Sequence, residues 1–371
     1  MKILIFNWQD IRNPLSGGAE VHLHEIFSRI AQLGHEVTLY CSSFKGAKRE
    51  ENIGGIRVIR EGGRYLFNFR VVYKYVTKFR KGNYDIVIDD MNKIPFFTPL
   101  YVRKPLFFIV HHLFNKSIFL EAPLPMALYV YSMEKIGIYI CKKMGVPVIV
   151  VSPSTKAEMI EKGIDSQKIY FAYNCVDHKL YNPGENNRSS TKLIGYFGRI
   201  KKYKSIEHLL QAFAIVIKEY PDLRLVIIGD GDNRINLQNL SKELGINNNV
   251  EFTGFVDEVT KVHLLQQMWF LVNTSSKEGW GLTVIEANAC QTPVIASNVP
   301  GLRDSVKDGE TGLLYEYGNI PELASKIKFL LDDNSLRDKL SANAYQWAKT
   351  FDWDATARTT IELLKSKLVK K

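Results

Sequence analysis

The feature that most constrains the fold is that the chain begins in the same way twice. An apolar run at residues 2–7 leads into the loop Gly17-Gly18 and a helical pattern. A second run at 192–197 leads into Gly198-Arg199 and another helical pattern. Continuous apolar runs of this kind are typical of parallel strands that are buried on both faces. Strand, glycine loop and helix in succession start a βαβ unit. We therefore predict two α/β domains, for which 371 residues are enough.

The composition removes several classes of protein. The net charge of +10 suits an anionic ligand, an anionic membrane or nucleic acid, but no Lys/Arg run is long enough for a nucleic-acid arm. Residues 1–6 enter a strand directly, without the pattern of a signal peptide, and no apolar stretch is long enough to span a bilayer. The four cysteines lie far apart, without Cys-x-x-Cys. Reduced thiols in a cytoplasmic protein are expected.

The segment 269–289 carries the strongest functional pattern. An apolar strand at 269–272 leads through a polar turn to Gly279-Trp280-Gly281, and a helix is predicted from about Leu282. A helix N-terminus presents unpaired N–H groups and a positive dipole to an anion, and the glycines let the backbone come close to it. Glu278 and Glu286, the latter expected in the first helical turn, suit sugar hydroxyls on either side of a diphosphate. Each acid alone would be read as a solvated group near a helix start.

These residues resemble a known enzyme family. Glu278-Gly279-Trp280-Gly281-Leu282 with Glu286 is similar to the E-x7-E element of retaining glycosyltransferases of family four, which have the GT-B fold. The stretches 293–297 and 309–314 continue that pattern. Thr283 departs from it, because many members carry proline there, which affects the loop more than the chemistry. The resemblance implies two Rossmann-like domains that face each other across a cleft.

The expected domains follow from this resemblance and from the polar, Pro- and Gly-containing stretch 183–191, which we read as a linker. Residues 1–182 would form the acceptor-binding domain and 192–352 the domain for the nucleotide sugar. In the family the last helix, here 353–371, crosses back to the first domain.

The resemblance also implies the donor site. Arg199 and Lys204 match a G-R-x4-K pattern whose cations neutralise the diphosphate leaving group. Gly229 and Gly231 would shape the nucleotide pocket, and Val256 would offer backbone groups to the base. Asp230-Gly231-Asp232 fits a D-x-D metal pattern, which we reject because the string is common by chance. No metal and no cofactor are expected. The other donor-binding residues are those around the central turn: Gly279, Trp280, Gly281, Leu282, Thr283 and Glu286.

The first domain offers candidates for the acceptor. Gly17 and Gly18 would let a phosphate or the acceptor approach the backbone. Asp90 ends a predicted strand, where α/β proteins bind ligands. Acceptor hydroxyls are favoured there over a metal, for which no third ligand is evident. From the residues alone a histidine at a strand end is more often structural. The family places a histidine near the transferred sugar, which implies His111 as a catalytic residue and leaves His112 as a rival.

Residues 64–81 predict a basic amphipathic helix. Arg70, Lys74, Lys78 and Lys81 share one face, and Val72, Tyr75, Val76 and Phe79 fall opposite. A surface helix packed on its own sheet is the plain interpretation. With the aromatic residues Tyr65, Phe67, Phe69 and Tyr73, the basic face favours an anionic membrane surface. The apolar segment 113–145 is either a core helix, which we favour, or a second membrane-contacting surface.

We therefore expect an enzyme that moves a sugar, with retention, from a nucleotide-diphosphate sugar to a glycan or lipid-linked acceptor. Its place would be the cytoplasm or the inner face of the membrane. The sequence shows no convincing nucleophile, so same-face attack is favoured, with the leaving phosphate taking the acceptor proton. The alternatives are a GT-B epimerase or phosphorylase, and a non-catalytic membrane-bound protein. A phosphorylase needs a pyridoxal-phosphate lysine, and no candidate stands out. The joint presence of Glu278, Glu286, Arg199 and Lys204 argues against the non-catalytic protein.

Overall fold

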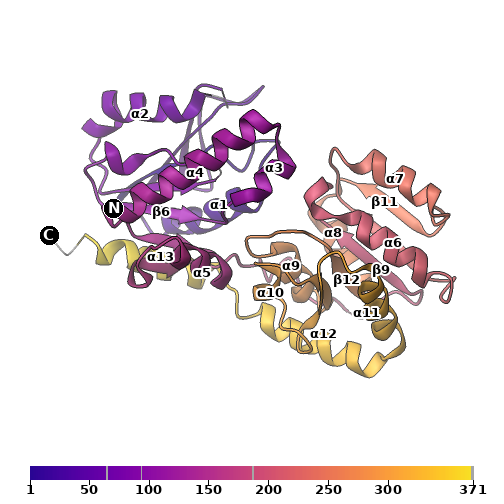
Figure 1. Ribbon diagram of the computed structural model, residues 1–371. Helices are drawn as coiled ribbons and strands as arrows, with labels where there is room; N and C mark the ends of the chain where they lie inside the picture. The colour runs from indigo at the N-terminus through magenta and orange to yellow at the C-terminus, as the bar shows by residue number, and fades with distance from the viewer. Residues whose placement is uncertain (64–65, 93, 186–187, 369–371) are drawn as a thin grey trace. The chain divides into compact units, whose positions relative to one another are not determined.

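The computed structural model describes residues 1–63, 66–92, 94–185 and 188–368 (Figure 1). It consists of two compact units, unit 1 with residues 1–174 and 353–371 and unit 2 with residues 175–352. Parts of three expected segments lie outside the described residues: 64–65 (with Tyr65) of the basic helix, 186–187 of the linker, and 369–371 at the C-terminal end.

The first boundary falls at 174/175, eight residues before the expected position of 182/183. Residues 175–182 belong to unit 2 because they bond to it. The Tyr181 hydroxyl donates to Glu258 at 2.7 Å, and Val176 pairs with Asp352. The expected linker is also fastened along unit 2, since the Arg188 guanidinium donates to the carbonyl of Trp269 and the hydroxyl of Ser341, each at 3.0 Å.

Unit 1 is built, over its described residues, on an eight-stranded sheet in the order β3-β4-β2-β1-β5-β6-β7-β8. Every neighbouring pair is parallel except β3–β4. The strands are β1 Lys2–Phe6, β2 Glu36–Cys41, β3 Glu50–Ile53, β4 Ile56–Arg60, β5 Ile86–Met91, β6 Leu106–Val110, β7 Val148–Val150 and β8 Ile169–Phe171. The apolar runs read from the sequence are thus the buried central strands of this sheet.

Helices cover this sheet and include one from the far end of the chain. Helix α1 buries Leu23, Ile26, Phe27 and Ile30, which recur at helical spacing. Helix α13 packs along α1, where Arg29 pairs with Asp354 at 2.6 Å (Figure 1). The helices of unit 1 are α1 Gly18–Gln32, α2 Phe67–Thr77, α3 Ile118–Glu121, α4 Leu124–Met144, α5 Pro153–Glu161 and α13 Trp353–Ser366.

Strand β3 was not anticipated. It is a polar strand that forms an antiparallel hairpin with β4 across Gly54 and Gly55. Both glycines have positive φ, 59° and 88°, as a tight hairpin turn requires. A Gly-Gly pair between two short runs is a hairpin signal, but the charges of β3 hid the alternation.

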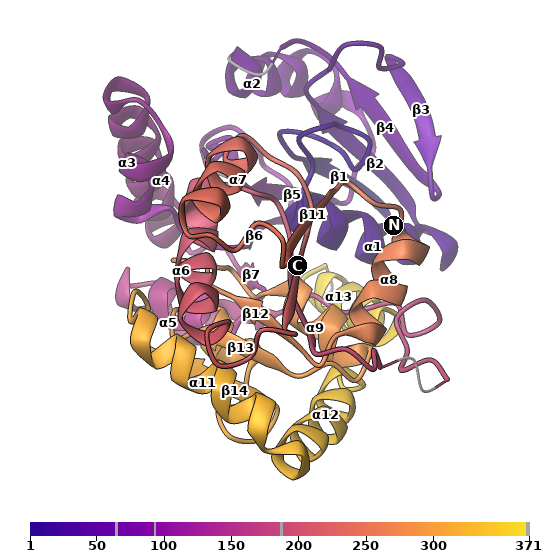
Figure 2. The same ribbon diagram turned by 90° about the vertical axis from the view of Figure 1, so that its right-hand side faces the viewer.

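Unit 2 has, among its described residues, a six-stranded parallel sheet in the order β11-β10-β9-β12-β13-β14. Its strands are β9 Leu193–Phe197, β10 Arg224–Ile228, β11 Val250–Gly254, β12 Phe270–Asn273, β13 Val294–Ser297 and β14 Gly312–Tyr315. Helices α6 and α11 share one buried apolar core with this sheet (Figure 2). The helices are α6 Ile206–Val216, α7 Arg234–Glu243, α8 Glu258–Gln267, α9 Leu282–Ala289, α10 Leu302–Ser305, α11 Ile320–Asp332 and α12 Asn334–Ala348.

The faces expected for the basic helix are partly wrong. Lys74 does not lie on a free basic face, because its ammonium group is held 2.6 Å from the buried Glu61 carboxylate. Val72 and Val76 are exposed, whereas the buried side of α2 consists of Phe67, Val71 and Tyr75. The buried face of α2 is offset by about one residue from the expected face. Aromatic packing against the sheet, rather than charge, sets the orientation of the helix.

Helix α4 buries one side and exposes apolar residues on the other. Ala127, Val130, Ile138 and Cys141 are buried. Its exposed apolar residues are Leu124, Met126, Leu128, Tyr129, Ile136, Tyr139 and Met144. The interpretation as a core helix therefore holds for only one face. Within the described part of the chain, no helix is both long and apolar enough to cross a membrane.

Candidate active site

The central turn of unit 2 lies between β12 and α9. Gly281 precedes the helix with φ 88° and ψ 57°, and α9 begins at Leu282, where the sequence predicts it. A Cβ at Gly281 would come within 2.9 Å of Leu302 and Ser305, so both conformation and packing require glycine. The N-terminus of α9 is thus set by a backbone that no other residue adopts without strain.

Hydrogen bonds hold this turn against the loop after β9. The Thr274 hydroxyl donates to the carbonyl of Lys204, and the Ser276 N–H donates to the carbonyl of Tyr203, both at 2.9 Å. Asn273 accepts from the Ser275 N–H at 3.1 Å and donates to the Thr283 hydroxyl at 3.3 Å. Asn273 was not singled out from the sequence, because its part in the turn depends on contacts with Ser275 and Thr283 that only the folded chain shows.

Lys204 and Glu278 form an ion pair across these two loops. Both side chains are largely buried, and the Ser275 hydroxyl also donates to Glu278 at 2.8 Å. Burial by itself would lower the pKa of Lys204, but the Glu278 carboxylate raises it above its ordinary value. The sequence predicted both residues at the donor, and the structure joins them directly.

Arg199 is exposed on the loop after β9. This loop lies tightly against the loop after β10. A Cβ at Gly229 would come 2.0 Å from the carbonyl oxygen of Gly198, and a Cβ at Gly231 would come 2.1 Å from that of Ile200. The two glycines therefore let the loop that carries Arg199 approach the loop after β10.

The two acids of the D-x-D string are engaged in ion pairs. Asp232 lies 2.7 Å from Lys201, and Asp230 lies 3.5 Å from Arg234. Over the described ranges, no group of three or more His, Cys, Asp or Glu side chains could hold a metal ion.

Trp280 and Val256, both expected to bind the donor, differ in burial. The Trp280 side chain is buried, with its ring 5.0 Å from that of Phe351, so it supports the turn by packing beneath it. Val256 is half-buried two residues after the end of β11, beside Phe255, which is 88 % exposed.

Glu286 lies in the second turn of α9, not in the first as expected, because the helix begins at Leu282. Its carboxylate is 12 % exposed and lies 3.9 Å from the ammonium group of Lys261. Burial raises the pKa of Glu286 to about 7, although Lys261 opposes the shift. Lys261 was not singled out from the sequence, since one lysine in a helical pattern reads as solvated.

In unit 1 the buried Asp90 at the end of β5 holds His111, which follows β6. Asp90 Oδ1 lies 2.9 Å from His111 Nε2. Burial by itself would lower the pKa of His111, but Asp90 raises it above its ordinary value. Asp90 Oδ2 is buried without a hydrogen-bond partner among the described residues. The neighbouring Asp89 points to the other face of the sheet and accepts from the Thr98 hydroxyl at 2.6 Å.

The two rival histidines have different surroundings. His111 is nearly buried and packs edge-on against the ring of His22, 5.0 Å between centroids. His112 is half-buried, and its ring lies 4.7 Å from that of Phe114.

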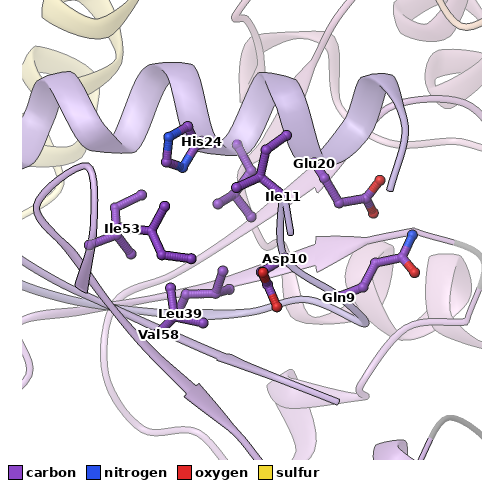
Figure 3. A pocket seen from close by; sticks show the side chains of 10 residues that line it. Gln9, Asp10, Ile11, Glu20, His24, Leu39, Ile53 and Val58 are labelled. Atoms are coloured by element: carbon purple, nitrogen blue, oxygen red, sulfur yellow. The ribbon is translucent and has the colours of Figure 1, made fainter. Parts of the chain in front are cut away.

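Glu20 lies in the first turn of α1 (Figure 3) and ties the loop Gly17-Gly18 to the same edge of the sheet. The Glu20 carboxylate accepts from the Gly17 N–H at 2.7 Å and from the Asn92 amide at 2.8 Å. Gly18 is exposed, and a Cβ there would meet nothing within 4 Å. Glu20 was missed, although an acid three residues after a helix start is a capping signal.

Comparison with known proteins covers both units. A model described as "Glycosyltransferase Family 4" matches residues 16–180, and a model described as "Glycosyl transferases group 1" matches residues 178–347. Together they span nearly all of the chain.

Two curated relatives match over part of their length. A D-inositol 3-phosphate glycosyltransferase of Corynebacterium urealyticum is 31 % identical over 239 residues, 59 % of this chain and 56 % of that protein. The capsular polysaccharide biosynthesis glycosyltransferase CapM of Staphylococcus aureus is 29 % identical over 230 residues, 57 % and 58 % of the two chains. The chain thus spans little more than half the length of these relatives.

Among solved structures, Alr3699/HepE of Anabaena, in complex with UDP-glucose, superposes with a TM-score of 0.78 and 21 % identity. The match covers 99 % of this chain and all of that one. At this identity the likeness establishes the fold.

Proposed function

Because this chain belongs to the group 1 glycosyltransferases and has their GT-B fold, we propose that it moves a sugar from a nucleotide-diphosphate sugar to a hydroxyl of an acceptor. The donor binds unit 2 and the acceptor binds unit 1. The observation that carries the proposal is the Lys204–Glu278 pair at the turn before α9, with Arg199 exposed on the adjoining loop.

These groups suit the departure of a diphosphate. As the bond from the anomeric carbon to the phosphate oxygen breaks, negative charge grows on the leaving group. Arg199, Lys204 and the N-terminus of α9 supply fixed positive charge and N–H groups for it, which is usually the largest catalytic contribution. Glu278 accepts hydrogen bonds from hydroxyls of the transferred sugar. Glu286 accepts hydrogen bonds from the hydroxyls of the ribose. No metal takes part in this proposal.

The acceptor hydroxyl attacks on the face from which the diphosphate leaves, so the sugar keeps its configuration. A bond forms between the acceptor oxygen and the anomeric carbon, the bond to phosphate breaks, and the leaving phosphate takes the acceptor proton. In unit 1, Asp90 and His111 bind hydroxyls of the acceptor. The open space at Gly18 admits an acceptor group to the start of α1.

The acceptor is a glycan or a lipid-linked glycan precursor, consistent with the role named for CapM. We also propose that unit 1 contacts an anionic membrane. Support comes from α2, where Phe69 and Tyr73 of the helix and Leu66 directly before it are at least 66 % exposed, and from α4. The outer face of α4 carries Lys135, Lys142 and Lys143 between apolar residues. Glu134, the only acid among the described side chains of α4, is buried and accepts the N–H groups of Phe114 and Asn115. The exposed face is thus apolar and cationic, as an interfacial surface should be.

The test is the melting temperature with UDP, GDP, ADP and their sugar conjugates, with and without Mg²⁺, followed by transfer assays with the conjugate that binds. A ligand at a hundred times its Kd stabilises by about 2.7 kcal/mol, which gives a clear shift. A shift without metal and a glycoside of retained configuration by NMR are expected. A shift only with Mg²⁺ would implicate Asp230 and Asp232. Inverted product would refute same-face attack, and no shift at all would refute the donor site.

A further inference from the structure

The side chain of Lys261, on α8, is almost fully enclosed and lies between two acids. Its side chain is 8 % exposed, and its ammonium group lies 2.7 Å from Glu258 and 3.9 Å from Glu286. The rings of Phe197 and Tyr181 lie below it, with centroids at 4.8 and 5.0 Å. A lysine that is buried to this degree must be paired, and a cation over aromatic rings gains further stabilisation.

Glu286 depends on this lysine more than a helix-start acid would. It lies in the second turn of α9, where the dipole of the helix no longer favours a negative charge. Burial raises the pKa of its carboxyl to about 7, Lys261 and Tyr181 lower it, and Glu258 raises it. Among the described residues, the buried thiol of Cys290, directly after the same helix, also interacts with Glu286.

We propose that Lys261 is a positioning residue which favours the ionised form of Glu286, so that near neutral pH and above this carboxylate accepts hydrogen bonds from both hydroxyls of the ribose diol of the nucleotide sugar. The inference rests on the proposed donor site and adds to it a control of donor affinity from α8. A carboxylate can accept two O–H bonds side by side, whereas a protonated carboxyl must give up one of these positions. Binding of the diol therefore selects the ionised form and expels a proton from any Glu286 that carries one.

The number of protons released on binding reports this directly. We would titrate the protein with sugar conjugates of UDP, GDP and ADP by calorimetry from pH 6 to 9, in pairs of buffers that differ in ionisation enthalpy. Unlike the terminal phosphate of a free nucleoside diphosphate, the diphosphate of these conjugates carries no proton that titrates in this range. The wild type should release close to one proton at pH 6 and almost none at pH 9. In Lys261→Met the carboxyl should stay protonated to higher pH. Release at pH 8 should then rise. A rise of one unit from a pKa of about 7 should lower the affinity at pH 7 by about fivefold, and the affinity should recover at pH 9.

Three variants make the result specific. Lys261→Arg keeps the cation and should keep the profile of the wild type. Glu286→Gln cannot titrate and should abolish the pH-dependent release. Lys328→Met removes a lysine that pairs with Glu219 at the surface of unit 2, and should change nothing. Melting temperatures show which variants are folded.

The outcomes separate the two claims. If the wild type binds a conjugate and Lys261→Met releases the same protons at every pH, the role of Lys261 is refuted. It is equally refuted if affinity falls by the same factor at pH 7 and pH 9, since that is a purely structural effect. If the wild type binds none of the conjugates, the donor site itself fails.

Discussion

The ammonium group of Lys204 is paired with the carboxylate of Glu278, which lies 74 residues later in the chain. The cation expected at the leaving diphosphate thus depends on the acid expected at the transferred sugar. Since Glu278 holds the pKa of Lys204 above its ordinary value, loss of the acid also weakens the cation. The two residues should act as a unit.

Glu278→Gln should therefore lower kcat by about 10²–10³-fold, the usual effect of losing one transition-state contact. The buried Lys204 loses its partner, so the deficit should deepen between pH 7 and pH 9. The measurement is the rate of sugar transfer at both pH values. The control is Lys201→Met. Lys201 lies on the same loop as Lys204, and this change removes only its exposed ion pair with Asp232. Near-normal turnover of Glu278→Gln would remove its assigned role.

Gly18→Ala should separate activity from stability. A Cβ at this position meets nothing in the protein, and alanine favours a helix more than glycine, so the melting temperature should hold or rise. If the acceptor approaches the backbone at this position, the added methyl group displaces it. The transfer rate should then fall by about tenfold to a hundredfold. Full activity in this variant would place the acceptor elsewhere.

Gly229→Ala should have the opposite pattern. Its Cβ would lie 2.0 Å from the carbonyl oxygen of Gly198, and its φ of 129° is strained for any L side chain. We expect a loss of at least about 2 kcal/mol in the free energy of unfolding, from strain and overpacking together. Calorimetric unfolding of both glycine variants tests this contrast. A melting temperature equal to that of the wild type would show that the two loops can separate at little cost.

The pairing of His111 with Asp90 predicts a pH dependence of stability. The pKa of His111 is raised in the folded protein, so its contribution is fully present below the unfolded pKa of about 6.5 and is lost as pH rises through the folded value. Asp90→Asn removes this contribution. The wild type should therefore exceed the variant in melting temperature most at pH 6, and the gap should narrow by pH 9. A constant gap would mean that His111 stays neutral.

Membrane contact through α4 predicts salt-sensitive binding to vesicles that contain anionic lipid. Replacing Lys135, Lys142 and Lys143 by Gln removes three cations worth about 1 kcal/mol each at the surface, so partitioning should fall roughly a hundredfold. Replacing the exposed lysines 218, 242 and 339 of unit 2 makes the same change in net charge and should have little effect. Equal losses in both sets would indicate non-specific attraction, and binding that is indifferent to salt would contradict the electrostatic account.

Much of this fold could be predicted from the sequence because its central strands are continuous apolar runs and its glycines mark the ends of helices. The segment from Trp269 to Gly281 predicted both strand β12 and the start of α9. The face of α2 could not be predicted, because Lys74 looks like any solvated lysine until Glu61, from another element, is placed beside it. Lys261 was missed for the same reason, since burial of a charged side chain is decided by partners distant in sequence.

The packing of α13 against α1 has a consequence for synthesis of the chain. Unit 2 is one continuous stretch, so it can fold as soon as it emerges from the ribosome. Unit 1 is interrupted, and the side of α1 that carries Arg29 waits for Trp353–Ser366, which are translated only after all of unit 2. The first unit to begin is thus the last to be completed, and a fragment that ends at Asn174 would leave that part of α1 uncovered and prone to associate with other chains.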